Sequence, residues 1–392
     1  MKRELIYNKE SVNYLNSILK RKIYKGLIVV TGQNIITGGP WTILNDSIDH
    51  LAAYKKDYLI IVILFKRLEK KHNNVINIIC RDSKKSWIHR FIYEKFKFNK
   101  FSKSLINNID LWVSMHDITP IVKAKKIITY YHNVSPFWKP RFYQIFLSPV
   151  TAIFKLFYLR ICQLNIYKND ALIVQQNWIK NKLLKKFPNL NIIICKPITN
   201  KQTYHTHFEK ETKRFKKYKE YLNKPFLLCP STPRVFKNIE TAIKAIQNLK
   251  KYNLLITISG NENIYTKYLK LLYSKIDNIF FIGYIEKDIL EFFYKKSDAI
   301  IFPSQLESWG LPISESIQFN KIIFLPDLEY SRETCGNYDN AIFYNSGSYL
   351  ELKNKIINKL LKENKENTIN KNNTNSDKIK SYNWNNLWPK IV

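Results

Sequence analysis

The sequence predicts an α/β protein made of two doubly wound domains, each with a parallel sheet covered by helices. Its 392 residues are too many for one ordinary core, and 45% of them are hydrophobic. Short continuous apolar runs alternate with amphipathic patterns, as buried parallel strands alternate with helices. A polar, charge-rich stretch separates two such series. We therefore expect two domains of comparable size.

The strands are predicted from apolar runs, several of which end at one of only nine glycines. We expect strands near 27–31, 58–64, 75–79, 110–114, 126–131 and 170–175, and a second series near 225–229, 254, 279, 298 and 321. Helices are expected between these strands, and the stretch 238–249 is one example. Its apolar residues Ile239, Ala242, Ile243 and Ile246 recur at spacings of three and four.

This alternation sets the domain boundaries. We expect a Rossmann-like N-terminal domain at 1–200, a connection at 201–223, a Rossmann-like second domain at 224–370 and a C-terminal helix within 371–392. Residues 362–380 are polar and of low complexity, which indicates a loosely ordered loop. Large apolar groups then return at helical spacing in 382–388, so we expect this terminal helix to dock on a domain.

The composition of the sequence limits which binding partners and which cellular location we expect. Sixty-four basic and 31 acidic residues leave a net charge of +33, which indicates an anionic partner such as nucleic acid, a phosphorylated substrate or an acidic membrane. A coding bias toward Lys, Asn and Ile would explain the charge equally well. Five scattered cysteines, the lack of a signal-peptide core and the lack of an 18-residue apolar run favour the cytoplasm.

The stretch FPSQLESWGLPISESI, residues 302–317, is the strongest candidate site. It follows an apolar run, and ligands bind beyond the carboxyl ends of parallel strands. Pro312 suits the first turn of a helix, so the amides of Gly310 and Leu311 would form an anion site. Glu315 is expected in the first helical turn and Glu307 on the preceding loop. Alternatively, Glu315 favours the helix dipole and Glu307 is a solvated loop residue.

Three further loops follow predicted strands. Residues 229–238 carry Arg234 and Lys237, which suit a diphosphate or form an ordinary basic surface. The loop 31–41 contains Gly38 and Gly39 but matches neither dinucleotide nor P-loop patterns.

Two neighbouring strands are expected to end in His116-Asp117 and His132-Asn133, which predicts a polar pocket at one sheet edge. The sequence contains no Asp-x-Asp, no Gly-x-Ser-x-Gly and no His-Glu-x-x-His. These absences disfavour a metal-diphosphate clamp, a hydrolase elbow and a zinc protease.

Taken together, these segments resemble those of retaining group 1 (family 4) glycosyltransferases of GT-B fold. The run 297–316 resembles their E-x7-E signature in its spacing, its Gly-Leu-Pro and its preceding strand. Other segments resemble family features in chain order, namely the glycine loop at 37–39, the strand at 110–117, the strand at 170–178, the Arg234 and Lys237 pair and the start of the C-terminal helix at 381–384.

The resemblance implies two Rossmann-like domains facing a deep cleft, with the C-terminal helix crossing back to the first domain. It implies that Glu315 binds the nucleotide ribose and that Glu307 is a catalytic residue that binds the transferred sugar. The donor would also contact Gly38, Gly39, Ser231, Tyr284, Gly310 and Leu311. The catalytic cations Arg234 and Lys237 would contact it as well. His132 would be catalytic, and His116, Asp117 and Asn133 would face the acceptor.

One departure concerns the basic pair. Many relatives space the Arg and the Lys more widely and follow the Lys with Gly, whereas here Lys237 follows Arg234 by three and precedes Asn238. The charges remain, and only the detailed geometry of the pair is left open.

The function implied is transfer of a hexose-type sugar, without a metal or other cofactor, from a nucleotide-diphosphate donor to a glycan or lipid-diphosphate acceptor in bacterial surface polysaccharide synthesis. The aromatic and basic segments at 136–147 and 154–160 would contact the anionic inner membrane, or would pack inside the first domain. The alternatives are a GT-B sugar-nucleotide epimerase and a nucleic-acid-binding protein, although no nucleic-acid module is recognisable.

Overall fold

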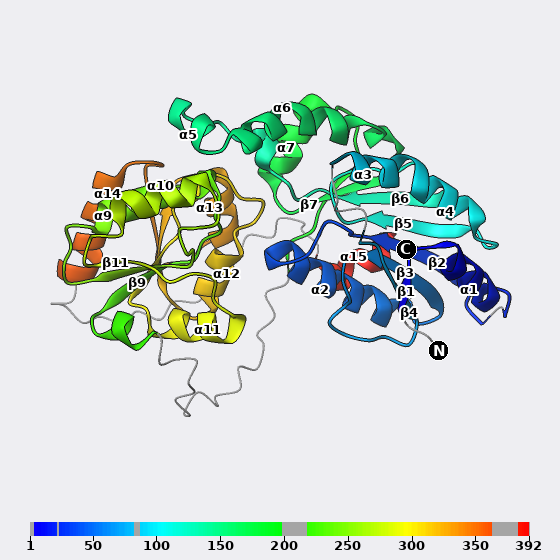
Figure 1. Cartoon of the computed structure of the whole chain (residues 1–392), viewed down its shortest axis with the longest axis horizontal. Helices are drawn as coiled ribbons and strands as arrows, with labels where there is room; N and C mark the ends of the chain where they lie inside the picture. Colours follow the sequence, from blue (N-terminus) through cyan, green and yellow to red (C-terminus); the bar gives the residue numbers. More distant parts are fainter. Residues whose placement is uncertain (1–3, 22, 82–86, 198–217, 363–382, 392) are drawn as a thin grey trace. The chain divides into compact units, whose positions relative to one another are not determined.

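The computed structural model describes residues 4–21, 23–81, 87–197, 218–362 and 383–391. These residues form two compact units. The first unit holds residues 4–136, 156–197 and 383–391, and the second holds 137–155 and 218–362. Each unit is described by itself below (Figure 1). Most of the predicted connection and the predicted low-complexity loop lie outside the described residues.

In its described part, the first unit is an eight-stranded sheet in the order β1-β4-β3-β2-β5-β6-β7-β8, with every pair of neighbours parallel. Its strands are β1 (Glu4–Ile6), β2 (Gly26–Thr31), β3 (Tyr58–Leu64), β4 (Val75–Ile79), β5 (Ile109–Ser114), β6 (Ala124–Tyr130), β7 (Ala171–Val174) and β8 (Ile192–Ile194). Strands β2 to β7 lie close to their predicted positions. The run from β4 to β7 has the order 3-2-1-4-5-6 of a Rossmann fold.

Helices cover both faces of this sheet. They are α1 (Lys9–Leu19), α2 (Gly38–Tyr54), α3 (Trp87–Ile92), the π-helix η2 (Tyr93–Lys97), α4 (Phe98–Ser104), η3 (Ser135–Phe137), η4 (Ile166–Lys168), α7 (Asn177–Lys186) and α15 (Trp384–Ile391). One apolar cluster joins alternate strand residues to α2 and α15, and another joins the opposite face to α1, η2 and α4. The alternation follows from the two-residue period of a strand.

Helix α15 packs beside α2 in the first unit (Figure 1). The Trp384 and Trp388 rings stack at 5.3 Å between centroids, and both are buried. Trp388 Nε1 donates to the carbonyl oxygen of Ser47 at 3.1 Å, which satisfies the indole while its ring fills the core. The chain therefore returns from the second unit to close a face of the first.

The second unit is a parallel sheet with six strands among the described residues, in the order β11-β10-β9-β12-β13-β14. They are β9 (Phe226–Cys229), β10 (Asn253–Ile256), β11 (Ile279–Phe281), β12 (Ala299–Ile301), β13 (Ile322–Pro326) and β14 (Ala341–Tyr344). Counted along the chain, this order is again 3-2-1-4-5-6. Its helices are η5 (Lys219–Leu222), η6 (Val235–Lys237), α9 (Ile239–Ile246), α10 (Ile264–Tyr273), α11 (Lys287–Lys296), α12 (Leu311–Gln318), α13 (Glu329–Cys335), α14 (Tyr349–Ile356) and η7 (Ile357–Lys362).

The segment 137–155 belongs to the second unit, unlike the predicted boundary at residue 200. It contains α5 (Phe142–Leu147) and the start of α6 (Pro149–Gln163), within which the division falls. The Trp138 ring packs on Phe236 of η6, and the Tyr143 hydroxyl donates to Glu240 of α9 at 3.1 Å. These partners lie about a hundred residues away, so no local pattern indicates them. Among the described helices, none is long and apolar enough to cross a lipid bilayer.

Candidate functional site

The two predicted donor loops of the second unit follow neighbouring strands. Strand β9 pairs directly with β12, and these are the first and fourth strands of the 3-2-1-4-5-6 order. The order of the strands reverses between them, and in open parallel sheets ligands bind at the carboxyl ends of the strands at such a point. The loop after β9 carries the basic pair, and the loop after β12 carries the E-x7-E stretch.

The basic loop is short and turns sharply into α9. Arg234 is exposed, and its guanidinium lies 5.8 Å from the centroid of the Phe236 ring. Asn238 ends η6 and begins α9 with a φ of 51°, in the left-handed region. Asparagine is among the few residues other than glycine that adopt this conformation readily. Asn238 therefore supplies a left-handed backbone turn at a position without glycine.

We expect the left-handed turn at Asn238 to set its tolerance to substitution. Asn238→Ala should lower the free energy of unfolding by roughly 1–2 kcal/mol, because Cβ and the carbonyl oxygen clash at positive φ. Asn238→Gly should stay within about 1 kcal/mol of wild type, because glycine adopts the turn freely at an entropic cost. Urea unfolding measures both variants, and an Ala variant as stable as the Gly variant would contradict this reason.

The basic loop and the E-x7-E loop are joined by an ion pair. Lys237 Nζ pairs with Glu307 Oε1, and the two side chains are only 11% and 14% exposed. Lys237 Nζ also lies 5.2 Å from the Phe302 ring centroid. The backbone is tied at the same point, where Gln305 N donates to the carbonyl oxygen of Phe236 at 2.8 Å. Glu307 is therefore a paired carboxylate rather than a solvated loop residue.

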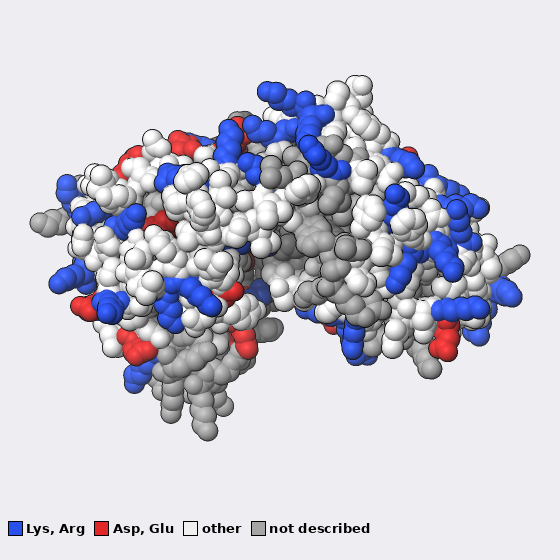
Figure 2. Space-filling model, turned by 45° about the horizontal axis from the view of Figure 1, so that its top comes forward, with Lys and Arg blue, Asp and Glu red and all other residues white. Residues whose placement is uncertain are grey.

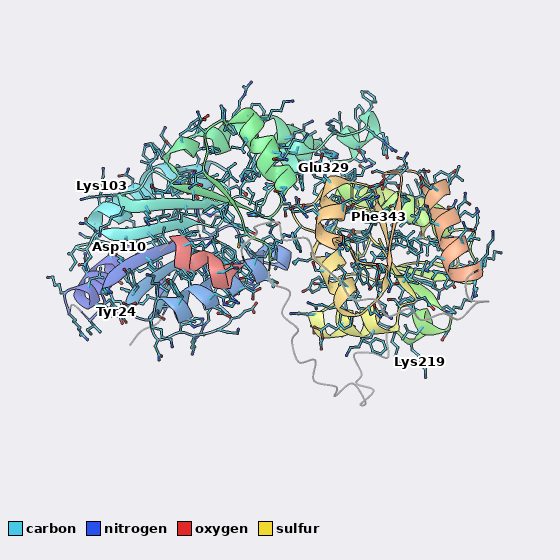
Figure 3. The ribbon with its side chains drawn as sticks, turned by 180° about the vertical axis from the view of Figure 1, so that it is seen from behind. Tyr24, Lys103, Asp110, Lys219, Glu329 and Phe343 are labelled. Carbon is cyan, nitrogen blue, oxygen red and sulfur yellow. The ribbon has the colours of Figure 1, made fainter. Side chains whose placement is uncertain are left out.

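The corner before α12 is held rigidly. Trp309 Nε1 donates to Ser314 Oγ at 2.8 Å, and the Thr334 hydroxyl donates to the carbonyl oxygen of Trp309. Tyr330 OH donates to the carbonyl oxygen of Ser304 at 2.5 Å. Thr334 and Tyr330 belong to α13, whose first residue, Glu329, is labelled in Figure 3. The loop is therefore fixed to a neighbouring helix before any ligand arrives.

Gly310 gives α12 an uncapped start. Its φ is 87°, and a Cβ there would lie 3.0 Å from Ile313 Cδ1, so only glycine fits without strain. Gly310 has no side chain to cap the helix, and Pro312 has no N–H to satisfy. Ile313 N already donates to the carbonyl oxygen of Gly310 at 2.9 Å, so the positive end that α12 offers to an anion lies at the Gly310 and Leu311 amides.

Glu315 lies one turn further along the helix than predicted. Because α12 begins at Leu311, Glu315 is in the second turn, and no acidic residue occupies the first. The amides at the start of the helix thus keep their positive potential. Burial raises the pKa of the Glu315 carboxyl, against the smaller lowering effects of a hydrogen bond from Tyr294 and the charge of Lys287. Tyr294 OH, from α11, donates to Glu315 Oε2 at 2.8 Å.

The two other predicted donor residues lie on loops of the same unit. Ser231 follows β9, and its N–H donates to Thr257 Oγ1 at 2.8 Å. Tyr284 follows β11 and is 84% exposed, after Gly283 at a φ of 77°. Gly283 N donates to the carbonyl oxygen of Ile258 at 3.1 Å, which ties this loop to the segment after β10 and leaves the Tyr284 ring exposed.

In the first unit, the two histidines lie at the ends of paired strands, as predicted. His116, after β5, is fully buried. Its Nε2 pairs with Glu94 Oε1 of η2, and its Nδ1 lies 3.3 Å from the carbonyl oxygen of Thr31. Gln33 Nε2 donates to the same Glu94 oxygen at 2.5 Å. His116 therefore ties the loop 31–41 to η2, and its side chain is closed to solvent.

Asp117 supports the loop that carries His132. It adopts a φ of 70°, and its Oδ1 accepts from the backbone N–H groups of His132 at 2.6 Å and Asn133 at 2.9 Å. Its Oδ2 accepts from Tyr158 OH at 2.6 Å. The His132 side chain is 18% exposed, and its ring stacks on Tyr130 at 6.1 Å. Asp117 therefore positions His132, which keeps partial access to solvent.

The remaining predicted residues are Gly38, Gly39 and Asn133, all in the first unit. Gly38 begins α2 at a φ of 73°, and Gly39 is its second residue. Asn133 Oδ1 accepts from Ser135 N at 3.0 Å. Asp110 lies at the other end of β5, near its start. There its Oδ2 accepts from Leu27 N at 2.9 Å and ties β5 to β2 (Figure 3).

Several residues that shape these sites were missed by the sequence analysis. They are Gln33, Glu94, Tyr158 and Tyr294. Each contacts a predicted residue from a different element and stands in no motif. Glu94 in particular lies in a charged stretch that reads as a solvated helix, yet it is only 3% exposed.

A family model described as "Glycosyl transferases group 1" matches residues 210–376, which include every strand of the second sheet. A comparison with curated proteins found no match. Several solved structures resemble most of the chain, across both units. A glycosyltransferase from Rickettsia africae has 19% identity and a TM-score of 0.58, with 85% of this chain and 87% of that chain covered.

Two further structures give similar values. Sucrose-phosphate synthase from Thermosynechococcus elongatus has 13% identity and a TM-score of 0.63, over 85% of this chain and 89% of that one. HepE from Anabaena, in complex with UDP-glucose, has 16% identity and a TM-score of 0.61, over 86% and 90%. The second unit therefore carries the sequence pattern of group 1 glycosyltransferases, and the chain as a whole has the GT-B fold.

Proposed function

We propose that this protein is a retaining, family 4 hexosyltransferase that uses a nucleotide-diphosphate sugar. The observation that carries the proposal is the pairing of Lys237 with Glu307 across the loops after β9 and β12. It brings a cation for the diphosphate and a carboxylate for the sugar together at the switch point of one sheet. Arg234 and the amide end of α12 add positive charge beside them.

The donor is proposed to bind along these groups. The diphosphate takes the Gly310 and Leu311 amides together with Arg234 and Lys237, so negative charge that grows on the leaving group is stabilised. Glu307 then exchanges part of its pairing with Lys237 for hydroxyls of the transferred sugar. Glu315 binds the ribose through the oxygen that Tyr294 leaves open. The base lies by Tyr284, with Ser231 near the phosphates.

The acceptor is proposed to bind to the first unit. His132, held by Asp117 and partly exposed, positions the acceptor hydroxyl or the sugar, and Asn133 lies next to it. Gly38 and Gly39 approach the donor phosphates through their backbone. The departing phosphate itself takes the acceptor proton, and configuration is retained. No metal is part of the proposed reaction, because lysine, arginine and backbone amides supply the positive charge.

We further propose a glycan or lipid-diphosphate acceptor in bacterial surface polysaccharide synthesis, with the protein in the cytoplasm and peripheral on the inner membrane. One structural neighbour is WaaG, whose printed description is a glycosyltransferase involved in lipopolysaccharide biosynthesis. The HepE structures with UDP-glucose and with UDP favour UDP as the nucleotide to try first. UDP, GDP and dTDP should be compared by thermal shift, since a ligand at 100 times its Kd stabilises by about 2.7 kcal/mol.

We expect Glu315→Gln to change donor affinity and stability in opposite directions. Loss of a charged hydrogen-bond acceptor should weaken nucleotide-sugar binding by roughly 10–100-fold. Because the folded-state pKa of Glu315 is raised, its ionised form is disfavoured by folding. That cost is absent below the ordinary glutamate pKa of about 4.3 and grows as pH rises through the raised pKa.

The ligand-free Gln variant should therefore melt higher than wild type at neutral pH, with the difference vanishing in acid. Calorimetric titration and thermal melts between acid and neutral pH measure the two effects. Wild-type donor affinity in this variant would show that Glu315 does not bind the donor.

Two other functions are separable from transfer. A sugar-nucleotide epimerase of the same fold would isomerise the donor without an acceptor, which chromatography of donor incubated alone would detect. Binding of nucleic acid through the +33 charge would appear as a salt-dependent gel shift. The ion-paired Glu307 and the uncapped α12 favour transfer over nucleic-acid binding, because neither feature is needed to bind a polyanion.

A further inference from the structure

Phe236 stands between the two proposed catalytic cations and connects them to their surroundings. It lies in η6 between Arg234 and Lys237, and it is only 5% exposed. The Arg234 guanidinium lies 5.8 Å from the centroid of its ring, within the range of a cation–π contact. Its carbonyl oxygen accepts from Gln305 N at 2.8 Å, on the loop after β12. Phe236 therefore ties the two donor loops together through its backbone and supports Arg234 through its ring.

The support of Arg234 matters because exposed cations are common on this protein. Lys and Arg side chains are spread over the face of the molecule seen in Figure 2, so positive charge alone does not mark a site. A cation contributes to transfer when it is held where negative charge develops, and a displacement of about 1 Å can cost about 100-fold in rate. The contribution of Arg234 therefore depends on how firmly the Phe236 ring is held.

The Phe236 ring is held by Trp138, about a hundred residues earlier in the sequence. The two rings meet edge to face, with centroids 6.4 Å apart and planes at 62°. Trp138 is 1% exposed, and it lies in the segment 137–155, which belongs to the second unit. Edge-to-face contact is a favoured geometry for aromatic pairs, so a buried Trp138 ring fixes the orientation of the Phe236 ring.

The same segment is anchored to the helix that follows the basic loop. Tyr143 OH donates to Glu240 Oε1 at 3.1 Å, and Glu240 also accepts from the Tyr265 hydroxyl of α10. Tyr265 OH in turn accepts from the N–H of Ile239, the first residue of α9, at 3.0 Å. The segment is therefore connected to the basic loop on both sides, at the aromatic ring of η6 and at the start of α9.

We propose that Trp138 is a positioning residue for sugar transfer, which acts through Phe236 on Arg234. Its ring holds the Phe236 ring, and with it the Arg234 guanidinium, where the leaving diphosphate gains negative charge. Trp138 itself contacts no reacting group. This inference rests on the proposed function of the basic loop. It gives a role in transfer to a segment for which the sequence predicted packing in the first domain or contact with a membrane.

The role belongs to the ring of Trp138 and not to its indole N–H. Trp138 Nε1 is buried and has no hydrogen-bond partner among the described residues. Trp138→Phe therefore loses no hydrogen bond, and it keeps an aromatic ring against Phe236. We expect its kcat to stay close to that of the wild type.

Trp138→Leu tests the proposal in the full-length protein, because it removes the ring and keeps an apolar side chain. Its kcat should fall by roughly 10–100-fold. The KM for the nucleotide sugar should change much less, because Arg234 acts mainly on charge that grows in the transition state. In an Arg234→Gln background the same substitution should lower kcat little further, since its effect passes through Arg234. Steady-state kinetics of the four proteins, corrected for the folded fraction by thermal melts, measure these effects.

The matched control is Tyr252→Leu, which removes another buried ring of the second unit. Tyr252 precedes β10 and so lies at the amino ends of the strands, away from the donor loops. This variant should melt at a lower temperature and keep the kcat of the wild type when folded. If Trp138→Leu does not fold, Trp138→Met takes its place, because the flexible methionine side chain adapts to irregular gaps.

Three results would overturn the positioning role. They are an equal fall of kcat in Tyr252→Leu, a fall in Trp138→Phe as large as in Trp138→Leu, and full additivity of Trp138→Leu with Arg234→Gln. A wild-type kcat in Trp138→Leu beside a slow Arg234→Gln would overturn it too, and would leave the donor site intact. A wild-type kcat in Arg234→Gln would overturn the assignment of the basic loop itself, so the two proposals fail separately.

Discussion

Arg234→Gln is expected to lower kcat by about 10²–10³-fold, the usual cost of removing one group that stabilises transition-state charge. Its melting temperature should stay close to the wild type, because Arg234 is exposed and its guanidinium lies 5.8 Å from the centroid of the Phe236 ring. Steady-state kinetics with the nucleotide sugar found by thermal shift, alongside melting curves, measure the two quantities. A variant with wild-type kcat would remove Arg234 from the site.

Lys237→Gln should lower both kcat and stability, in contrast to Arg234→Gln. Lys237 and Glu307 are 11% and 14% exposed, and removing one partner of such a pair leaves the other charge poorly solvated. Breaking a buried pair costs up to about 3–5 kcal/mol, and partial exposure here reduces that figure. The Lys237→Gln/Glu307→Gln double variant should recover most of the stability and none of the activity. This cycle separates the structural role of the pair from its role in transfer.

The second large effect is expected at Asp117. Asp117→Ala should lower the free energy of unfolding of the first unit by roughly 3–5 kcal/mol. The change leaves two backbone N–H groups and the Tyr158 hydroxyl without their acceptor, and it puts alanine at a φ of 70°. Transfer should also fall, because the carboxylate holds the backbone of His132. Urea unfolding followed by near-ultraviolet circular dichroism, together with kcat, gives both readings.

Two milder variants make the Asp117 prediction specific. Asp117→Asn keeps the left-handed turn and one acceptor oxygen, so it should lie between wild type and alanine. Tyr158→Phe removes a single hydrogen bond and should cost about 1 kcal/mol. Equal unfolding midpoints for Asp117→Ala and wild type would mean that these hydrogen bonds do not hold the loop.

The strands and the loops that follow them could be predicted because their signals are local. Buried parallel strands read as continuous apolar runs, and β2, β3, β4 and β9 lie within a residue or two of their predicted ends. Strands β1, β8 and β14 were missed, because three or four residues at a sheet edge carry too little pattern. The start of α12 was predicted from Pro312, but Glu315 lies in the second turn rather than the first, because the helix already begins at Leu311.

By itself, the sequence determined two parallel-sheet units, the Gly-Leu-Pro corner and the residues that stand at the carboxyl ends of the strands, since strand period, glycine and proline act over a few neighbouring residues. The tertiary structure alone decided what those residues touch. It paired Lys237 with Glu307, brought the Asp117 carboxylate into hydrogen bonds with the backbone of the His132 loop, and buried His116 against Glu94. It also docked α5 on the second unit and left Phe142 and Phe146 exposed. These outcomes depend on contacts between residues tens of positions apart, which form only when the sheets bring distant strand ends together.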